Sequence, residues 1–109
     1  ALGYSSRHEI IYATRKIAEK VMNQKLKLNE INESEFTSNL YSGNHSQPDL
    51  LIRTGGEFRI SDFLLWQIAY SEIYISEKYW PDFDENDFNE AIDNYLKRER
   101  RFGKISEQL

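Results

Sequence analysis

The sequence predicts an α/β fold with a parallel sheet, and two observations support this. Segments of helical periodicity alternate with short apolar runs, and the two clearest runs, Leu50–Ile52 and Ile73–Ile75, are each flanked by polar or turn-forming residues. Parallel sheets usually contain about 5–6 strands, so two complete strands leave the sheet incomplete. We therefore expect residues 1–109 to be the carboxyl-terminal half of a single domain whose amino-terminal half is absent.

The first helix is predicted from its cap and its periodicity. Ser6 and Glu9 have the Ser-x-x-Glu spacing of a capping box, and the helix should end between Asn23 and Lys27. Because this helix begins so early, Ala1-Leu2 reads as the tail of a strand. Its apolar positions recur at helical spacing: Ile10, Ala13, Ile17 and Val21.

A shorter helix and a loop should follow. Asn32 with Glu35 offers a second cap, for a helix that runs through Leu40 and stops near Gly43. Residues 42–47 are polar and rich in turn formers, which predicts a loop.

The next stretch, residues 48–61, is the one that predicts a binding site. A strand over residues 49–54 should deliver Arg53 to its carboxyl end, where Gly55-Gly56 lets the backbone turn and approach a ligand closely. Arg59 follows, and Ser61 is expected to begin a helix with free amide groups. Ligands of open α/β sheets lie beyond the carboxyl ends of strands, and helix N-termini attract anions. Together these features predict a cradle for a phosphate or diphosphate.

The remaining elements are a helix, a strand, a turn and a last helix. Apolar residues surround the helix expected over residues 61–70, which predicts burial or an interface. Ile73–Ile75 is the second strand, and Trp80-Pro81 turns the chain. Asp84 and Asp87 should begin the last helix, which ends in the basic run 97–101 as the helix dipole favours.

Composition excludes several classes of protein. A net charge of -4 argues against a general nucleic-acid binder, which needs a basic face. The chain has no cysteine, which excludes disulfides and thiolate chemistry. No apolar run approaches the roughly 20 residues of a membrane span, and no signal peptide is visible. These features predict a soluble, cytoplasmic protein.

Two motifs carry a resemblance to a known family. Arg53-Thr54-Gly55-Gly56-Glu57-x-Arg59-x-Ser61 and Trp80-Pro81-Asp82-Phe83 closely resemble the carboxyl-terminal part of cis-prenyltransferases, specifically bacterial undecaprenyl diphosphate synthase, also called isoprenyl transferase. The match is dense over residues 48–103. The opening ALGYSSRHEI looks like the family's ALNYGGRxEI, with Gly3 in place of asparagine and Ser5-Ser6 in place of two glycines.

The resemblance implies a chemistry. Enzymes of this family condense isopentenyl diphosphate repeatedly onto an allylic diphosphate such as farnesyl diphosphate, and undecaprenyl diphosphate is the precursor of the cell-wall lipid carrier. Because the allylic diphosphate must leave, Mg²⁺ and cationic donors are expected to stabilise the developing charge. The family is usually dimeric, which implies a homodimer, and its lipid product would bring the protein to the inner membrane surface.

The resemblance also assigns roles to individual residues. It implies that Glu72 helps to hold Mg²⁺. It also implies that the isopentenyl diphosphate site is formed by Arg53, Arg59, Ile60 and Ser61. The positions expected to support this site are Thr54, Gly55, Gly56, Glu57, Arg101 and Gly103.

Structural alternatives stand beside these assignments. The arginines could form an ion pair with Glu57, Ser61 could be a plain helix cap, and Glu72 could be a surface carboxylate. Glu57 is expected to orient the arginines rather than to act as an acid or base. The basic run from Lys97 to Lys104 is either a solvated helix end or a segment that reaches the partner subunit's active site. The aromatic and apolar residues of the expected helix favour core or dimer interface over substrate contact: Phe63, Leu65, Trp66 and Tyr70.

The family's catalytic aspartate lies in an amino-terminal motif resembling Asp-Gly-Asn-Gly-Arg-Trp, which this sequence does not contain. We therefore expect the full-length protein to be an enzyme and this chain alone to be inactive. The competing interpretations are a non-catalytic subunit or fragment that supports a partner chain, and a generic phosphate-binding α/β domain.

Overall fold

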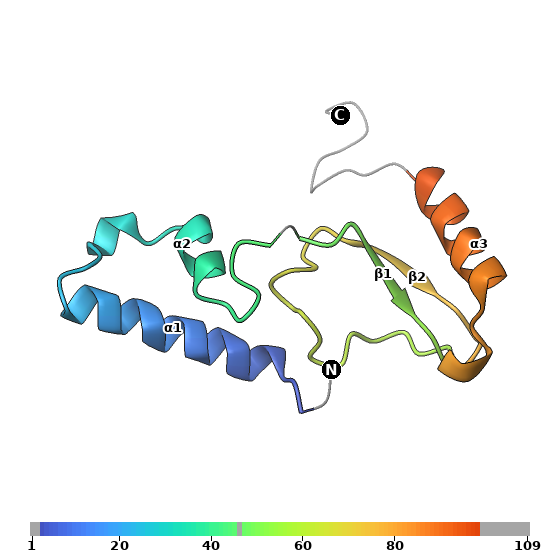
Figure 1. Cartoon of the computed structure of the whole chain (residues 1–109), viewed down its shortest axis with the longest axis horizontal. Coiled ribbons are helices and arrows are strands. Elements are labelled where there is room, and N and C mark those ends of the chain that lie inside the picture. Colours follow the sequence, from blue (N-terminus) through green and yellow to red (C-terminus); the bar gives the residue numbers. More distant parts are fainter. Residues whose placement is uncertain (1–2, 46, 99–109) are drawn as a thin grey trace. The chain divides into compact units, whose positions relative to one another are not determined.

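The computed structural model describes residues 3–45 and 47–98, which form two compact units (Figure 1). The first unit takes in residues up to 46 together with 60–66, and the second takes in 47–59 and the residues from 67 onward. The predicted strand tail at Ala1-Leu2 and the site residues Arg101 and Gly103 lie outside the described residues. No helix in the described part of the chain is long and apolar enough to cross a membrane.

The first unit is built on α1 (Ser6–Met22), as its periodicity predicts. The predicted capping box is wrong by one residue, because Ser5 is the N-cap and its hydroxyl accepts from the His8 amide at 3.3 Å. The Glu9 carboxylate accepts from the Tyr4 hydroxyl at 2.5 Å and the Tyr41 amide at 2.9 Å, and the Ser6 amide donates to the Asp62 carbonyl at 3.0 Å. One face of α1 is buried: Ser6, Glu9, Ala13 and Ile17.

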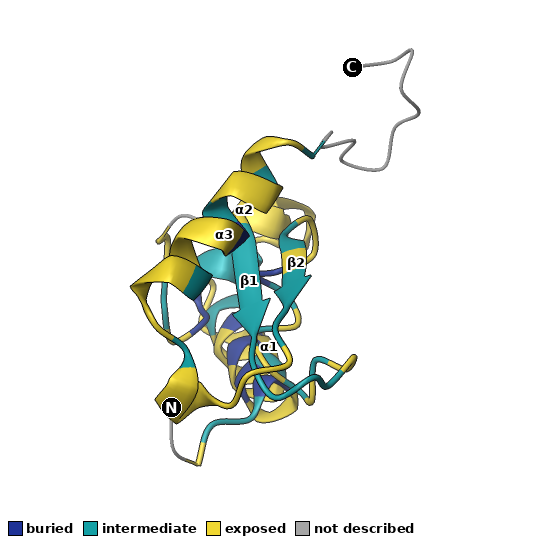
Figure 2. Ribbon diagram, turned by 90° about the vertical axis from the view of Figure 1, so that its right-hand side faces the viewer, coloured by how far each residue is buried: buried dark blue, intermediate teal, exposed yellow. Residues whose placement is uncertain are grey.

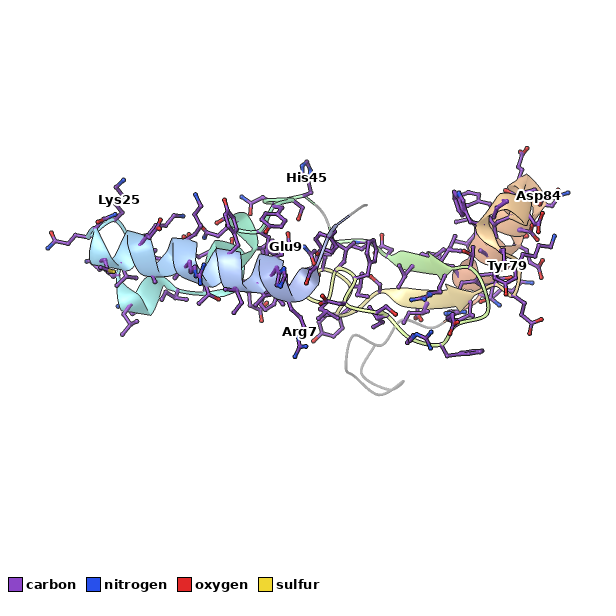
Figure 3. All side chains as sticks on the ribbon, turned by 90° about the horizontal axis from the view of Figure 1, so that it is seen from below. Arg7, Glu9, Lys25, His45, Tyr79 and Asp84 are labelled. Atoms are coloured by element: carbon purple, nitrogen blue, oxygen red, sulfur yellow. The ribbon has the colours of Figure 1, made fainter. Side chains whose placement is uncertain are left out.

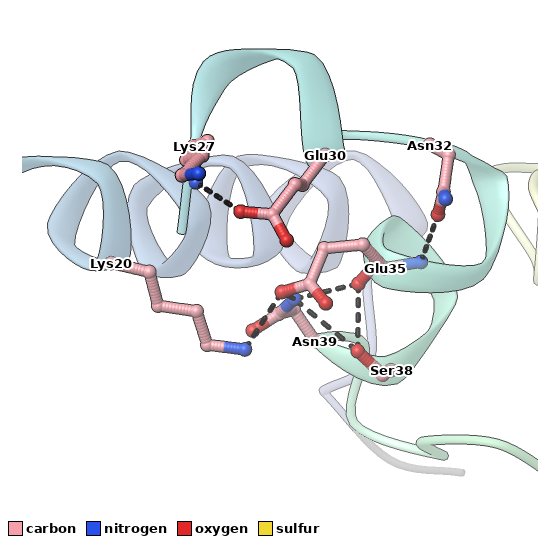
Figure 4. A network of polar contacts seen from close by, with 7 residues as sticks. All are labelled: Lys20, Lys27, Glu30, Asn32, Glu35, Ser38 and Asn39. Atoms are coloured by element: carbon pink, nitrogen blue, oxygen red, sulfur yellow. Dashed lines mark hydrogen bonds and ion pairs between the residues drawn. The ribbon is translucent and has the colours of Figure 1, made fainter. Parts of the chain in front are cut away.

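A polar network joins α1 to α2 (Glu33–Ser38), with the short 3₁₀ turn η1 (Leu28–Glu30) between them (Figure 4). Asn32 caps α2 as predicted, because its side-chain oxygen accepts from the Glu35 amide at 2.8 Å. The Glu35 carboxylate pairs with Lys20 of α1 at 2.8 Å, and this hydrogen bond is the main reason why the pKa of Glu35 lies below its ordinary value. The helix ends at Ser38, two residues before the predicted Leu40.

The predicted helix beginning at Ser61 is wrong, because residues 62–70 form bends and turns. Three residues of the predicted helix adopt the left-handed backbone region: Ser61 (φ 54°), Asp62 (φ 62°) and Leu64 (φ 47°). A right-handed helix cannot start through such residues.

Contacts with the start of α1 explain this departure. The Asp62 carboxylate accepts from the Ser5 hydroxyl at 2.5 Å and from the Arg7 amide at 2.9 Å, and its carbonyl accepts from the Ser6 amide at 3.0 Å. The Leu65 amide donates to the Ser6 hydroxyl at 2.9 Å. Asp62 therefore accepts from two free amides at the N-terminus of α1, and the Leu65 amide bonds to the Ser6 side chain instead of to a local helical carbonyl.

The second unit contains the two predicted strands, β1 (Leu50–Arg53) and β2 (Glu72–Ile75). They pair in parallel, with Leu50 opposite Glu72 and Arg53 opposite Ile75, which confirms the predicted parallel sheet. Every residue of β1 is only half-buried, and Ile73 of β2 is exposed. This sparse burial agrees with the prediction that the sheet is incomplete, since a two-stranded sheet is at best marginally stable.

The 3₁₀ turn η2 (Trp80–Asp82) leads into α3 (Glu85–Leu96). The predicted cap is confirmed as a reciprocal pair: Asp84 accepts from the Asp87 amide, and Asp87 accepts from the Asp84 amide, both at 3.0 Å. Ala91 of α3 and Ile68 are the buried apolar residues of this unit among those described. Figure 2 shows that β1 is half-buried along its length.

Candidate substrate-binding site

The loop that follows β1 is held by hydrogen bonds to the segment that follows β2. The Arg53 carbonyl accepts from the Ser76 amide, and the amides of Gly55 and Gly56 donate to the carbonyls of Lys78 and Ser76, each at 2.8 Å. Both glycines have positive φ, 85° at Gly55 and 71° at Gly56. Glycine adopts such angles without steric cost, so the local sequence permits this turn.

Three charged residues of the predicted site are connected to one another in this loop. The Arg53 guanidinium donates to the Arg59 carbonyl at 2.6 Å, and the Arg59 guanidinium pairs with the Glu57 carboxylate at 2.9 Å. The side chains of Arg59 and Glu57 are 67% and 44% exposed, respectively. The loop therefore gathers two guanidinium groups and one carboxylate, with the Arg59 side chain open to solvent.

The cluster has the chemistry of an anion site. A guanidinium carries five N–H donors and binds phosphate oxygens in a bidentate way, and the loop holds one more cation than anions. The alternative considered above, an ion pair with Glu57, is present at Arg59, but an exposed pair contributes only about 0–1 kcal/mol. A diphosphate could replace or share that contact at little cost, so the ion pair and the binding role are compatible.

Ile60 and Ser61 belong to the first unit and directly precede the bend at Asp62. Ile60 is half-buried and Ser61 is exposed. Because no helix begins at Ser61, the predicted free amides of a helix N-terminus do not form part of the described site. The Ser61 hydroxyl remains a candidate ligand on chemical grounds alone.

Glu72, the predicted metal ligand, lies at the far end of the sheet from Arg53. It is the first residue of β2 and pairs with Leu50, whereas Arg53 pairs with Ile75. Three residues of strand separate the two positions by about 10 Å, and an offset of three places their side chains on opposite faces. The Glu72 carboxylate faces Arg98 at 3.5 Å, and Arg98 also donates to the Ile73 carbonyl at 2.6 Å.

The donor set suits Mg²⁺ only in part. Among the described residues, no group of three His, Cys, Asp or Glu side chains gathers around a common point. Mg²⁺ often takes one or two carboxylates from a protein and its other ligands from phosphates and water, so one glutamate is sufficient as a contribution. The geometry does not bring that glutamate to the arginine loop within this unit.

The sequence did not indicate two residues that support the loop, Ser76 and Lys78. Their contribution is made through backbone carbonyls, which any residue type could offer. The Lys78 ammonium also pairs with the Asp87 carboxylate at 3.0 Å. This contact raises the pKa of Lys78, and the Asp84 amide followed by Lys78 lowers the pKa of Asp87.

A further missed residue is Glu9, whose side chain lies near the start of α1 (Figure 3). It is 1% exposed, although it lies on a helix with many charged residues. Burial, followed by the hydrogen bond to Glu9, raises the pKa of the Tyr4 hydroxyl. Apolar periodicity could have placed position 9 on the buried face, but the capping-box spacing suggested another role.

Comparison with known proteins gives the family of this chain. The family described as putative undecaprenyl diphosphate synthase matches residues 1–103. The chain is 49% identical over 105 residues to an isoprenyl transferase of Oceanobacillus iheyensis, covering 96% of this chain and 42% of the relative. It is 52% identical over 104 residues to a geranylgeranyl-diphosphate-specific tritrans,polycis-undecaprenyl-diphosphate synthase of Thermoplasma volcanium, covering 95% and 40%.

The chain is also similar in sequence and fold to a solved structure. The lavandulyl diphosphate synthase of Lavandula x intermedia, in complex with dimethylallyl diphosphate, is 42% identical with a TM-score of 0.90, covering 95% of this chain and 45% of that one. The chain thus spans about two fifths of the length of the curated relatives that it matches. It belongs to the undecaprenyl diphosphate synthase family of cis-prenyltransferases.

Proposed function

We propose that this chain provides the isopentenyl diphosphate site of a cis-prenyltransferase. The whole protein would condense isopentenyl diphosphate with an allylic diphosphate, such as farnesyl diphosphate, to make undecaprenyl diphosphate. The observation that carries the proposal is the loop at the carboxyl end of β1. In this loop Arg53 donates to the Arg59 carbonyl, and the Arg59 guanidinium pairs with Glu57. Family membership supports the type of reaction, and the loop supports the type of ligand.

In this proposal, the two arginines bind the diphosphate of the incoming unit. Arg53 is anchored on the Arg59 carbonyl, so its guanidinium is held in one place before the ligand arrives. Arg59 is more exposed and exchanges its contact with Glu57 for a phosphate oxygen. Ile60 and Ser61 complete the site, with Ser61 contributing a hydroxyl. Thr54, Gly55 and Gly56 shape the turn.

We also propose that Mg²⁺ serves the whole protein, with Glu72 as the carboxylate from this chain. When bound, the metal would stabilise the charge that develops on the departing allylic diphosphate. Glu72 must then exchange its contact with Arg98, which is long at 3.5 Å and therefore weak. The opposite placement of Glu72 and Arg53 means that we assign no joint step to them.

The remaining proposals concern the whole protein and its surroundings. We propose that it forms a homodimer, with Arg101 and Gly103 in a segment that contributes to the partner's site. It would function in the cytoplasm without binding nucleic acid, and its lipid product would bring it to the inner membrane surface.

Replacement of Arg53 tests the proposal. In the whole protein, Arg53→Ala removes charge-assisted hydrogen bonds of roughly 1.5–3 kcal/mol each. We expect the KM for isopentenyl diphosphate to rise by about a hundredfold, with little change in the KM for the allylic diphosphate. Steady-state assays in which each substrate is varied separately would measure both constants.

Arg15→Ala is the matched control, because Arg15 is an exposed arginine of α1 outside the loop. It should leave both KM values unchanged. An Arg53→Ala enzyme with the wild-type KM for isopentenyl diphosphate would refute the assigned role.

A further inference from the structure

The loop that carries the arginines is supported by a segment that is itself tied to the start of α3. Lys78 makes both connections. Its backbone carbonyl accepts from the Gly55 amide at 2.8 Å, and its side-chain ammonium pairs with Asp87 at 3.0 Å. One residue therefore links the glycine turn to the cap of α3, through its main chain on one side and its side chain on the other. Along the chain, residues 79–84 connect Lys78 to the start of α3, and Figure 3 labels the two ends of this connection, Tyr79 and Asp84.

The helix end of this connection is rigidly defined. The same carboxylate oxygen of Asp87 that faces Lys78 also accepts from the Asp84 amide at 3.0 Å, within the reciprocal cap of α3. The Asp87 side chain is only 15% exposed. The hydrogen bonds of the helix cap therefore hold the Asp87 carboxylate in position to pair with the Lys78 ammonium.

Hydrogen bonds also define the other end of this connection, next to the arginine loop. The Ser76 carbonyl holds the Gly56 amide at 2.8 Å, and the Ser76 hydroxyl accepts from the Lys78 amide at 3.3 Å. The segment 76–78 thus bends so that the carbonyls of Ser76 and Lys78 accept from the two glycine amides. A displacement of this segment would move the residues between Arg53 and Arg59. It would thereby move the two guanidinium groups that are proposed to bind the anion.

We propose that Lys78 is a positioning residue for substrate binding: its ion pair with Asp87 fixes the segment 76–78 against α3 and thereby sets the conformation of the arginine loop. This inference rests on the proposed isopentenyl diphosphate site. Lys78 does not touch the substrate and acts through the glycine turn. Binding of isopentenyl diphosphate should therefore depend on a pair of side chains located outside the loop.

A double-mutant cycle in the whole protein tests this. Lys78→Met removes the charge but keeps an extended side chain, and Asp87→Asn keeps an oxygen for the Asp84 amide. Each variant should raise the KM for isopentenyl diphosphate by about two- to fivefold, the range expected from one partly exposed ion pair. The double variant should be no worse than either single variant, because both remove the same contact.

Three further measurements separate positioning from general stability. Lys78→Arg keeps the positive charge and can form the ion pair with Asp87. Its KM for isopentenyl diphosphate should therefore be near the wild-type value. The KM for the allylic diphosphate and the kcat should not change in any variant. Lys25→Met, which removes an equivalent exposed charge from the first unit, should leave all constants unchanged.

Several results would overturn the inference. A wild-type KM in Lys78→Met, additive effects in the double variant, or a parallel rise of both KM values with a lowered thermal midpoint would each do so. The failure of the proposed function is distinguishable. If Arg53→Ala also leaves the KM for isopentenyl diphosphate unchanged, the site assignment is wrong, whereas if only Lys78→Met has no effect, the positioning role alone is wrong.

Discussion

At the scale of single residues, the two glycines of the loop have the most specific requirement. Gly55 has φ 85° and an amide bonded to the Lys78 carbonyl. A Cβ added there would meet the Tyr79 ring at 3.8 Å, which is an ordinary contact. The obstacle to a side chain at position 55 is therefore its backbone conformation and not a lack of space.

Gly55→Ala should consequently destabilise the loop by about 1–2 kcal/mol. We expect a lower free energy of unfolding and a higher KM for isopentenyl diphosphate, because alanine favours a conformation that moves the arginines. Chemical denaturation and steady-state kinetics on the whole protein would measure the two effects.

Gly43→Ala provides the control for this variant. Gly43 has φ 60°, and a Cβ added there would meet nothing within 4 Å, so the same substitution imposes similar backbone strain elsewhere. It should lower stability without changing the KM. Equal effects of the two variants on the KM would contradict a specific role for the Gly55 turn.

At the scale of secondary structure, the elements predicted correctly are those specified by local signals. Asn32 and Asp84 each cap their helix by accepting a hydrogen bond from the amide three residues later, and this contact depends only on nearby sequence. The strand at Leu50–Arg53 is likewise marked by its own apolar run.

The helix predicted from Ser61 failed for the opposite reason. The residues that determine the structure there are Ser5, Ser6 and Arg7, which are more than 50 positions away in the chain. Apolar residues with a serine before them indicate a helix locally, but the sequence does not reveal that Asp62 satisfies the N-terminus of α1. Because this helix does not form, its N-terminus cannot contribute the free amides that we predicted for the anion site.

The Asp62 contacts predict a pH dependence. The Ser5 hydrogen bond is the largest reason why the pKa of Asp62 lies below its ordinary value, with the Arg7 amide contributing further. A carboxyl group with a lowered folded-state pKa stabilises the fold above its unfolded pKa of about 3.9, and this contribution is lost as the pH falls through the folded pKa.

Asp62→Asn should therefore lower the thermal midpoint of the whole protein at pH 7, and the difference from wild type should shrink as the pH falls below about 4. Asp93→Asn, an exposed aspartate of α3, should show no such difference. Thermal unfolding followed by circular dichroism at several pH values would measure this. A constant gap between the two proteins at all pH values would contradict the role of the Asp62 charge.

At the scale of the whole molecule, we propose that the described chain contributes groups that bind substrate, because its candidate site residues lie at a strand end. The parallel pairing of β1 with β2 places Arg53 at a strand end, and this much followed from the sequence motif. The position of Glu72 on the other end and face of the sheet did not, because motif spacing alone does not state on which side of a strand a residue projects. The pairing of Lys78 with Asp87 was equally hidden, since neither residue belongs to the binding motif.

We have proposed that Arg53 and Arg59 bind the diphosphate of isopentenyl diphosphate. A crystal structure of the whole protein with isopentenyl diphosphate would show these contacts. We predict that diphosphate oxygens lie within about 3 Å of both guanidinium groups, with the Gly55 and Gly56 amides still bonded to the segment 76–78. A diphosphate bound elsewhere, with Arg59 still paired to Glu57 and Arg53 making no contact with the ligand, would contradict the account.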